Sequence, residues 1–379
     1  GAEGKVITLS GNAQDENSFD TPTLLVPVET TFTEFAEKFT YEFAPMSYTI
    51  MRIKARPTVR QRFIPAAMTE PDVHDPVIAQ GEDGRFYIFC TGMNVGVMSS
   101  ADLKEWKFEP SALSETPAWA MDTVPGYRGH TWAPDISYHN GLWHLYYSCS
   151  TFGKNGSAIG LAVNKTLDPK SPDFKWVDKG MVIASHKGKD CWNAIDPNLI
   201  VDKDGTPYLT FGSFWDGIQL IELSKDDFKT PVSKPKTISR RFDRKFTLDN
   251  IEFTQEGNNV IEAGPNAVEA PFVFKHGDYY YLFVSFDYCC RGANSTYKTV
   301  YGRSKKITGP FIDKDGKRMD KGGGTYLYGP NEEYFGVGHN AAFTYYGQPF
   351  FISHAYEKSQ GSRAKLFIRP MNFDKDGWI

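Results

Sequence analysis

The sequence predicts an all-β protein, a five-bladed β-propeller with a short N-terminal β extension packed on it. Three observations predict this fold. One unit of sequence recurs five times, each unit holds two strand-like runs around a glycine turn, and helical periodicity over about twelve residues is absent. A radial array of small sheets accounts for all three observations.

Each unit begins with a short apolar run and closes a hairpin through a glycine turn. A proline, or its equivalent, opens the first run, where a strand tolerates the missing N–H group. We count Ala341 as the last proline equivalent. The five units begin at His74-Asp75-Pro76, Trp132-Ala133-Pro134, Ile195-Asp196-Pro197, Glu269-Ala270-Pro271 and His339-Asn340-Ala341.

Residues 1–62 do not follow the repeat, so we expect two parts: an N-terminal β segment, and a propeller over residues 63–379. The segment has too few strands for an independent sandwich, which favours packing on the main body. Its order, from ENSFDTPTLLVPVE to FTYEFAPMSYTIMRIKA, resembles the last strands of the C-terminal β-sandwich of family 51 α-L-arabinofuranosidases. That likeness includes no catalytic residue, and an ordinary β extension is the alternative.

The composition excludes some partners. The 379 residues carry a formal charge of -4, and nucleic-acid binding requires a basic face. The basic cluster Lys234–Lys245 is expected to be a solvated loop between blades. The sequence contains no run of about 18 apolar residues, the length that a membrane-spanning helix requires. The five cysteines form no spaced disulfide framework, and Cys90 and Cys149 are expected to be buried. We expect the protein to be a monomer.

Three acids recur at the start of the first run. Asp75 and Asp196 directly precede the proline, and Glu269 stands one position earlier on a longer side chain. An Asp before Pro is often only a turn residue, but three acids in register at the propeller axis favour a site. Clustered carboxylates raise the pKa of at least one member, which supplies a general acid beside a general base. Hydrolysis of a glycosidic bond requires that pair.

Several longer motifs resemble glycoside hydrolase family 43, most closely its endo-1,5-α-L-arabinanases. They are RGHTWAPDI (128–136), NAIDPNLI (193–200), GSFWDGIQ (212–219), VEAPFVFKHGDYYYLFVSFDYCCRG (268–292), GRSK (302–305) and VGHNAAF (337–343). The resemblance implies that Asp75 is the general base, Glu269 the general acid and Asp196 the residue that tunes the acid. It also implies inversion of configuration, with the acid and base roughly 6.5–9.5 Å apart.

The resemblance further implies a cation, usually calcium, at the axis beside His339. Calcium prefers oxygen ligands, so one histidine among waters would make a structural and electrostatic site. An ordinary hydrogen-bonded histidine is the alternative for His339.

Other residues of the motifs are candidates for the sugar subsites. Trp132 and Trp215 could stack on a furanose ring, and His74, Asn193 and Ser213 could bind sugar hydroxyls. Core packing or turn chemistry remains an equal alternative for each of them.

The leading hypothesis is endo-hydrolysis of α-1,5-linked L-arabinan by a secreted, periplasmic or cell-surface enzyme. The same fold and acids could instead serve an exo-acting α-L-arabinofuranosidase or β-xylosidase. A carbohydrate-binding propeller without catalysis is a third possibility, although it would not need three acids in register.

Overall fold

The computed structural model describes residues 2–36, 38–53, 68–251, 254–256 and 259–379. The chain divides into two compact units, Gly1–Ile64 and Pro65–Ile379. The predicted boundary at residues 62 and 63 lies outside the described residues. Packing of the N-terminal segment on the propeller stays a prediction. Within the described part of the chain, no helix is long and apolar enough to cross a membrane.

The N-terminal unit is a three-stranded antiparallel sheet in the order β2-β1-β3. Its strands are β1 (Ala2–Ser10), β2 (Val28–Phe35) and β3 (Ser47–Ile53). Phe35 is buried, and its ring lies 4.7 Å from that of Phe32 and 4.9 Å from that of Phe39. The few strands therefore share a small aromatic core.

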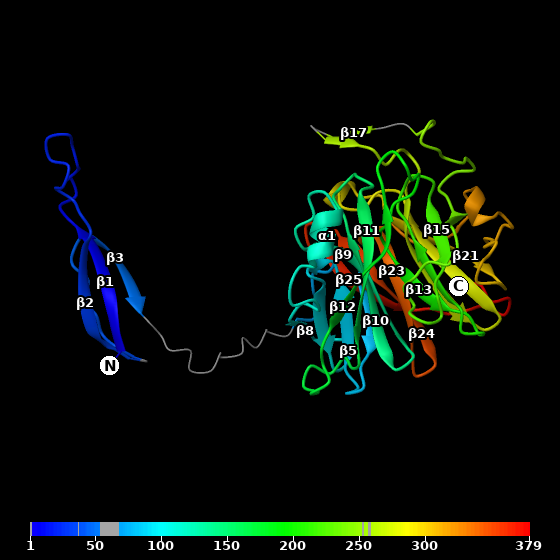
Figure 1. The fold of residues 1–379 in the computed structure, drawn as a ribbon, viewed down its shortest axis with the longest axis horizontal. Helices are drawn as coiled ribbons and strands as arrows, with labels where there is room; N and C mark the ends of the chain where they lie inside the picture. Colours follow the sequence, from blue (N-terminus) through cyan, green and yellow to red (C-terminus); the bar gives the residue numbers. More distant parts are fainter. Residues whose placement is uncertain (1, 37, 54–67, 252–253, 257–258) are drawn as a thin grey trace. The chain divides into compact units, whose positions relative to one another are not determined.

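The second unit is a five-bladed propeller, as predicted. Figure 1 shows its strands gathered into one body. Its first three blades are β4 (Val77–Gln80), β5 (Phe86–Cys90), β7 (Gly96–Ser100) and β8 (Trp106–Glu109); β9 (His130–His139), β10 (Leu142–Cys149), β11 (Ser157–Asn164) and β12 (Val177–Ser185); and β13 (Asn198–Val201), β14 (Pro207–Phe211), β15 (Ile218–Glu222) and β16 (Lys236–Ser239). The last two are β19 (Val268–His276), β20 (Tyr279–Phe286), β21 (Lys298–Ser304) and β22 (Thr325–Tyr328); and β23 (Tyr334–Tyr345), β24 (Gln348–Glu357) and β25 (Arg363–Pro370).

The remaining elements lie between these strands. They are β6 (Gly92–Met93), which pairs with β9, the hairpin of β17 (Thr254–Glu256) and β18 (Asn259–Ile261), the helix α1 (Ala118–Thr123), and the 3-10 turns η1 (Gly292–Asn294) and η2 (Met319–Lys321). The helix has six residues, in agreement with the missing helical periodicity.

The innermost strands form a closed circuit. Contacts run from β4 to β9, from β9 to β13, from β13 to β19, from β19 to β23, and from β23 back to β4. The start of the unit completes the last blade, because Asp72 bridges Lys365 of β25 and the Val73 N–H donates to the Ala364 carbonyl (3.0 Å). The first and last parts of the propeller thus share one sheet.

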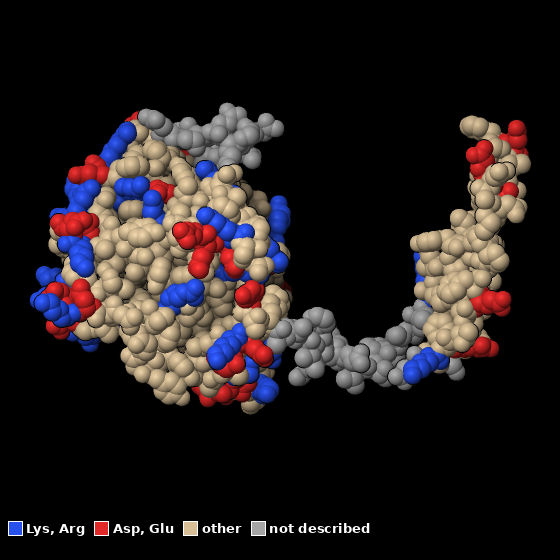
Figure 2. Space-filling model, turned by 180° about the vertical axis from the view of Figure 1, so that it is seen from behind, with Lys and Arg blue, Asp and Glu red and all other residues tan. Residues whose placement is uncertain are grey.

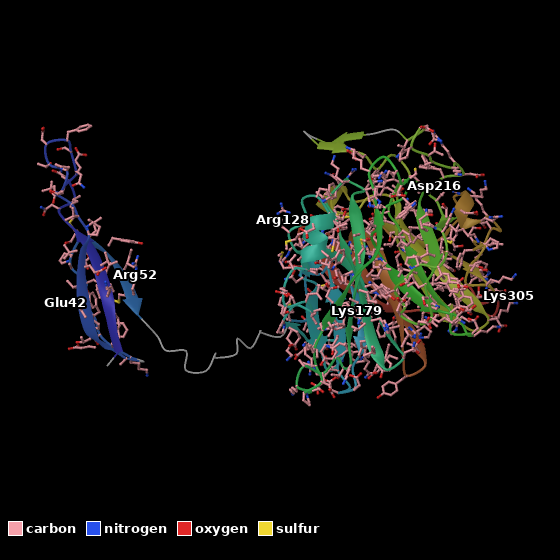
Figure 3. The ribbon with its side chains drawn as sticks, viewed as in Figure 1. Glu42, Arg52, Arg128, Lys179, Asp216 and Lys305 are labelled. Atoms are coloured by element: carbon pink, nitrogen blue, oxygen red, sulfur yellow. A yellow bond between two sulfur atoms is a disulfide. The ribbon has the colours of Figure 1, made fainter. Side chains whose placement is uncertain are left out.

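The basic cluster Lys234–Lys245 is more than the solvated loop expected from the sequence. Arg240 makes a two-pronged ion pair with Asp216 (2.8 and 2.7 Å), and the Arg240 side chain is only 11% exposed. Figure 3 labels Asp216 near β15. Arg241 bonds Asp287 at 2.8 Å. The Arg240 pair lies within blade 3, and the Arg241 pair joins blade 3 to blade 4. On the face that Figure 2 shows, charges of both signs are interspersed over the propeller.

Candidate active site

Just before each innermost strand, or within its first half, stands a residue in the left-handed backbone conformation. These residues are Asp75 (φ 53°), Ala133 (φ 38°), Asp196 (φ 58°), Ala270 (φ 55°) and His339 (φ 52°). In blades 2, 4 and 5 a break in the strand register falls at this point. Such a bulge redirects side chains. In these three blades the residue one position before the left-handed one, which is Trp132, Glu269 or Gly338, pairs with the equivalent position of the second strand.

This alignment corrects one detail of the repeat. Because His339 matches Asp75 and Asp196, the proline equivalent of the last unit is Asn340 and not Ala341. The sequence offered no proline there to mark the position. Asp75, Asp196 and His339 therefore occupy equivalent places in three blades, while Glu269 reaches the axis from the preceding position.

The N–H groups of these five residues form a ring of hydrogen bonds, each directed to the preceding blade. The acceptors are His354 Nδ1 for Asp75 (3.1 Å), Thr91 Oγ1 for Ala133 (2.9 Å), Ser148 Oγ for Asp196 (2.9 Å), Asp196 Oδ2 for Ala270 (3.1 Å) and Ser285 Oγ for His339 (2.8 Å).

Blade 3 differs from the others because Gly212 stands where an acceptor side chain is expected. The Gly212 N–H donates to the Ile195 carbonyl (2.8 Å), just as the Thr91 N–H donates to that of His74 (3.0 Å). A Cβ atom on Gly212 would lie 2.8 Å from the Gly217 carbonyl oxygen, and φ is 127°. The Asp196 carboxylate takes over as acceptor, which fixes its orientation.

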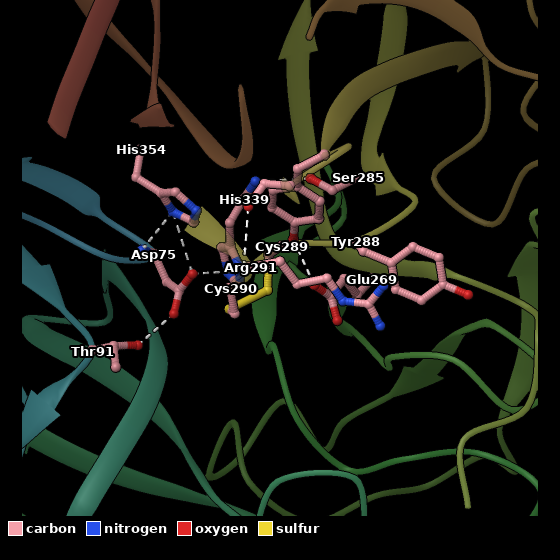
Figure 4. The surroundings of a disulfide bond; sticks show 12 residues. Asp75, Thr91, Glu269, Ser285, Tyr288, Cys289, Cys290, Arg291, His339 and His354 are labelled. Carbon is pink, nitrogen blue, oxygen red and sulfur yellow. Dashed lines mark hydrogen bonds and ion pairs between the residues drawn. A yellow bond between two sulfur atoms is a disulfide. The ribbon is translucent and has the colours of Figure 1, made fainter. Parts of the chain in front are cut away.

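Asp75 is held ionised by its neighbours (Figure 4). His339 Nδ1 lies 3.1 Å from Asp75 Oδ1, and the Thr91 hydroxyl donates to Oδ2 at 2.5 Å. Burial alone would raise the pKa of Asp75, but the charge and hydrogen bond of His339, with smaller effects of His354 and His74, keep that pKa well below its ordinary value. Asp75 is suited to accept a proton from water.

The two histidines beside Asp75 differ in charge. Burial lowers the pKa of His339, but Asp75, Asp196 and Glu269 outweigh it and raise that pKa to about 9. Burial lowers the pKa of His354 well below its ordinary range, so His354 is neutral. The positive charge beside Asp75 therefore belongs to His339, and His354 positions the Asp75 backbone.

The pKa of Glu269 is raised above its ordinary value. Burial raises its pKa, and the nearby Asp75 adds to the effect; hydrogen bonds to Ser213 and Tyr297 and the charge of His339 oppose it without reversing it. The Ser213 hydroxyl donates to Glu269 Oε2 (2.7 Å), and the Tyr297 hydroxyl donates to Oε1 (2.8 Å). Glu269 is suited to donate a proton.

Asp196 has a raised pKa as well. Burial is the main cause, His339 opposes it, and the charges of Glu269 and Asp75 add to it. The structure thus brings together the four residues predicted at the axis, namely Asp75, Asp196, Glu269 and His339. The pKa of Asp75 is lowered while those of Asp196 and Glu269 are raised, and acid–base catalysis requires such a separation.

The predicted subsite residues have different surroundings. Trp132 is half-buried, and its Nε1 donates to His130 (3.0 Å). Trp215 is only 3% exposed, which leaves almost no ring surface for a sugar. Asn193 is buried beside Ser185, and Ser213 bonds the acid. The His74 ring packs on His354 (4.3 Å between centroids).

Sequence reasoning missed the residues that support these acids. Thr91, His354 and Tyr297 belong to no repeat motif, and His354 and Tyr297 are fully buried. A sequence signal could have found Thr91 and His354. Each stands directly after the second strand-like run of its unit, opposite the start of that unit's first run. Ser148 and Ser285 occupy the same place in their blades.

Polar atoms without a partner occur at and beside the axis. Both amide atoms of Asn340, next to His339, are buried without a hydrogen-bond partner, as is His354 Nε2. Among the described residues, the group whose ligand atoms all lie within 4.8 Å of one another is His74, Asp75 and His354, which does not include His339. Carboxylate and amide oxygens are the ligands that calcium takes.

The chain matches known proteins over the whole propeller. A family model described as Glycosyl hydrolases family 43 matches residues 67–379. The extracellular exo-α-(1→5)-L-arabinofuranosidase ArbA of Cellvibrio japonicus is 44% identical over 308 residues, 81% of this chain and 85% of that protein. The extracellular endo-α-(1→5)-L-arabinanase 1 of Bacillus subtilis is 40% identical over 315 residues, 81% of this chain and 86% of that protein.

Among solved structures, an exo-1,5-α-L-arabinanase from a bovine ruminal metagenomic library has 58% sequence identity and a TM-score of 0.75. The match covers 82% of this chain and 96% of that one.

Proposed function

Since the chain belongs to glycosyl hydrolase family 43, we propose that it hydrolyses α-1,5-linked L-arabinan and cuts within the polysaccharide chain. The observation that carries the proposal is the buried axial cluster, in which the pKa of Asp75 is lowered and that of Glu269 is raised. A carbohydrate-binding propeller without catalysis would not need these acids, so we do not propose that alternative.

In the proposed mechanism, Asp75 removes a proton from a water molecule that attacks the anomeric carbon. Glu269 donates its proton to the leaving glycosidic oxygen, so that the bond breaks without an alkoxide. A negative charge on Glu269 raises the pKa of Asp196, so the two carboxyl groups disfavour a second negative charge, and in this way Asp196 tunes the acid. Attack by water opposite the leaving group inverts the anomeric configuration, which NMR of the first-formed product measures.

The variant Glu269→Gln tests the assignment of the acid. We expect kcat on linear arabinan to fall by about 10²–10⁴-fold, because the amide cannot donate the catalytic proton. Arabino-oligosaccharides should still bind, as calorimetry would show. Glu262→Gln is the matched control, because Glu262 pairs with Lys154 and Lys187 instead of lying in the cluster. Equal activities of the two variants would contradict the role of Glu269.

The exo mode is the second candidate, because two of the relatives above are named as exo-acting enzymes. Chromatography of early products from debranched arabinan separates the two modes. Oligosaccharides of several lengths support internal cutting. A single short product from the first time point would replace endo action by exo action, and activity confined to β-xylosides would point to the β-xylosidase alternative.

We also propose that calcium binds at the axis beside His339, with Asn340 as a possible oxygen ligand. When bound, the ion would supply positive charge that stabilises the ionised carboxylates. Chelation followed by readdition of calcium tests this, with the melting temperature as a readout besides turnover. An unchanged melting temperature and unchanged activity after chelation would argue against the ion.

The proposed setting is extracellular, since two relatives carry that word in their names, and the proposed form is a monomer. Activity in the culture medium rather than in washed cells tests the location. Light scattering of the purified protein tests the monomer.

A further inference from the structure

The loop between β20 and β21 carries a disulfide bond between adjacent residues, Cys289 and Cys290. No spaced cysteine pattern in the sequence predicts this bond. Cys289 is half-buried and Cys290 is exposed. Figure 4 shows the bond among the side chains of the axial cluster, including Asp75, Glu269 and His339. The disulfide has no role in the proposed mechanism.

Several contacts fix the base of the loop. Asp287 forms ion pairs with Arg241 (2.8 Å) and Lys298 (2.7 Å). Tyr288 and Thr296 are joined by two hydrogen bonds, from the Thr296 N–H to the Tyr288 carbonyl (2.9 Å) and from the Tyr288 N–H to the Thr296 hydroxyl (3.2 Å). The disulfide is therefore carried on a closed loop with a defined position.

A buried tyrosine connects the disulfide with the catalytic base. The Cys290 N–H donates to the Tyr356 hydroxyl at 2.8 Å, and Tyr356 is only 3% exposed. The Tyr356 ring packs against those of His74 (5.7 Å) and His354 (5.2 Å). Since His354 accepts the N–H of Asp75, two side chains link the disulfide loop to the general base.

The neighbouring groups have the chemistry of a sugar-binding surface. The Tyr288 ring lies 6.0 Å from that of Phe214, and the Arg291 guanidinium lies over the Tyr288 ring at 4.1 Å. Disulfide sulfur is apolar and polarizable, so it can pack against the C–H face of a sugar ring. A guanidinium at the edge can donate hydrogen bonds to sugar hydroxyls.

We propose that the Cys289–Cys290 disulfide is a binding platform for a pentofuranose ring of the substrate chain, next to the catalytic carboxylates. This inference rests on the proposed arabinan hydrolysis and deepens it. The alternative is that the disulfide only clasps its own loop. The two differ in what removal of the bond changes, because a platform affects sugar affinity while a clasp affects stability.

The test compares KM and kcat on linear arabinan for the wild type, the double variant Cys289→Ala/Cys290→Ala and the wild type reduced with a phosphine. We expect KM to rise about tenfold with kcat changed less than threefold, in both the double variant and the reduced enzyme. Reduction provides a second route should the double variant fail to fold. Cys191→Ser is the matched control, since Cys191 is a free and partly exposed cysteine.

Calorimetry with arabino-oligosaccharides in the Glu269→Gln background should show the same tenfold loss of affinity on reduction. Tyr356→Phe keeps the disulfide and removes one anchor of the loop, so a smaller rise in KM is expected. A lower melting temperature with unchanged KM would overturn the platform and leave arabinan hydrolysis intact. Failure of the wild type to hydrolyse arabinan would overturn both proposals.

Discussion

The acid Glu269 depends on two hydroxyl groups that act against its protonation. Hydrogen bonds from Ser213 and Tyr297 stabilise its charged form, while burial stabilises the neutral form and prevails. The two hydroxyls hold the carboxyl group in one orientation at the expense of part of the pKa rise. The carboxyl group is therefore held in a defined position while its pKa remains raised.

Removal of the Tyr297 hydroxyl should shift the pH profile in a known direction. In Tyr297→Phe the charged form of Glu269 loses a donor, so its pKa rises further and the alkaline limb of kcat/KM moves to higher pH. We also expect kcat to fall about tenfold, since the acid is less well oriented. Tyr301→Phe is the control, because its hydroxyl bonds Ile379 near the C-terminus. A shift to lower pH would contradict this account.

At the scale of elements, the start of each inner strand is the decisive feature. The left-handed residue turns its N–H toward the preceding blade and its side chain toward the axis, which suits a bulge. Only two of the five positions hold alanine, Ala133 and Ala270; the other three carry the functional side chains Asp75, Asp196 and His339. Left-handed conformations cost free energy for residues with a side chain, and functional sites commonly retain such cost.

Two substitutions at Ala133, which has φ 38° and is buried, should have unequal effects on the free energy of unfolding. Ala133→Val places a β-branched residue in the left-handed region and should lower the free energy of unfolding by about 2 kcal/mol or more. Ala133→Gly removes the backbone penalty and should stay within about 1 kcal/mol of the wild type. Urea denaturation measures both, and equal losses would show that backbone conformation is not the cause.

The sequence allowed the strand starts to be found, but not the groups that act on them. Pro76, Pro134, Pro197 and Pro271 marked the register well enough to place three acids at one axis. The last unit lacks a proline, so its register was one residue off. Thr91 could have been found from its place after a second run, but Tyr297 and the Cys289–Cys290 bond were out of reach, because their importance arises from contacts that no local pattern records.

At the scale of the whole molecule, the propeller is closed by strands from both ends of its chain. Residues just before the first blade pair with β25, through the Asp72–Lys365 bridge and the Val73 N–H. The relative from the ruminal library matches 82% of this chain over nearly its own full length, so a propeller without residues 1–64 is a reasonable folding unit.

Two truncations should therefore differ in stability. Removal of residues 1–64 should leave the melting temperature of the propeller within a few degrees of that of the full chain, and turnover on arabinan should persist. Removal of residues 1–72 deletes the Asp72–Lys365 bridge to β25 and should lower the melting temperature clearly. Calorimetry of both forms beside the full chain measures this. Equal melting temperatures would show that the pairing with β25 contributes little.

The ring of N–H bonds at the axis has no first or last member, because each blade both gives a bond and receives one. The reaction centre is built from several blades. A small displacement of one blade therefore shifts the carboxylate or histidine to which it is hydrogen-bonded in the next blade. Loss of catalysis should thus be an early sign of loosening anywhere in the ring, well before the strands themselves separate.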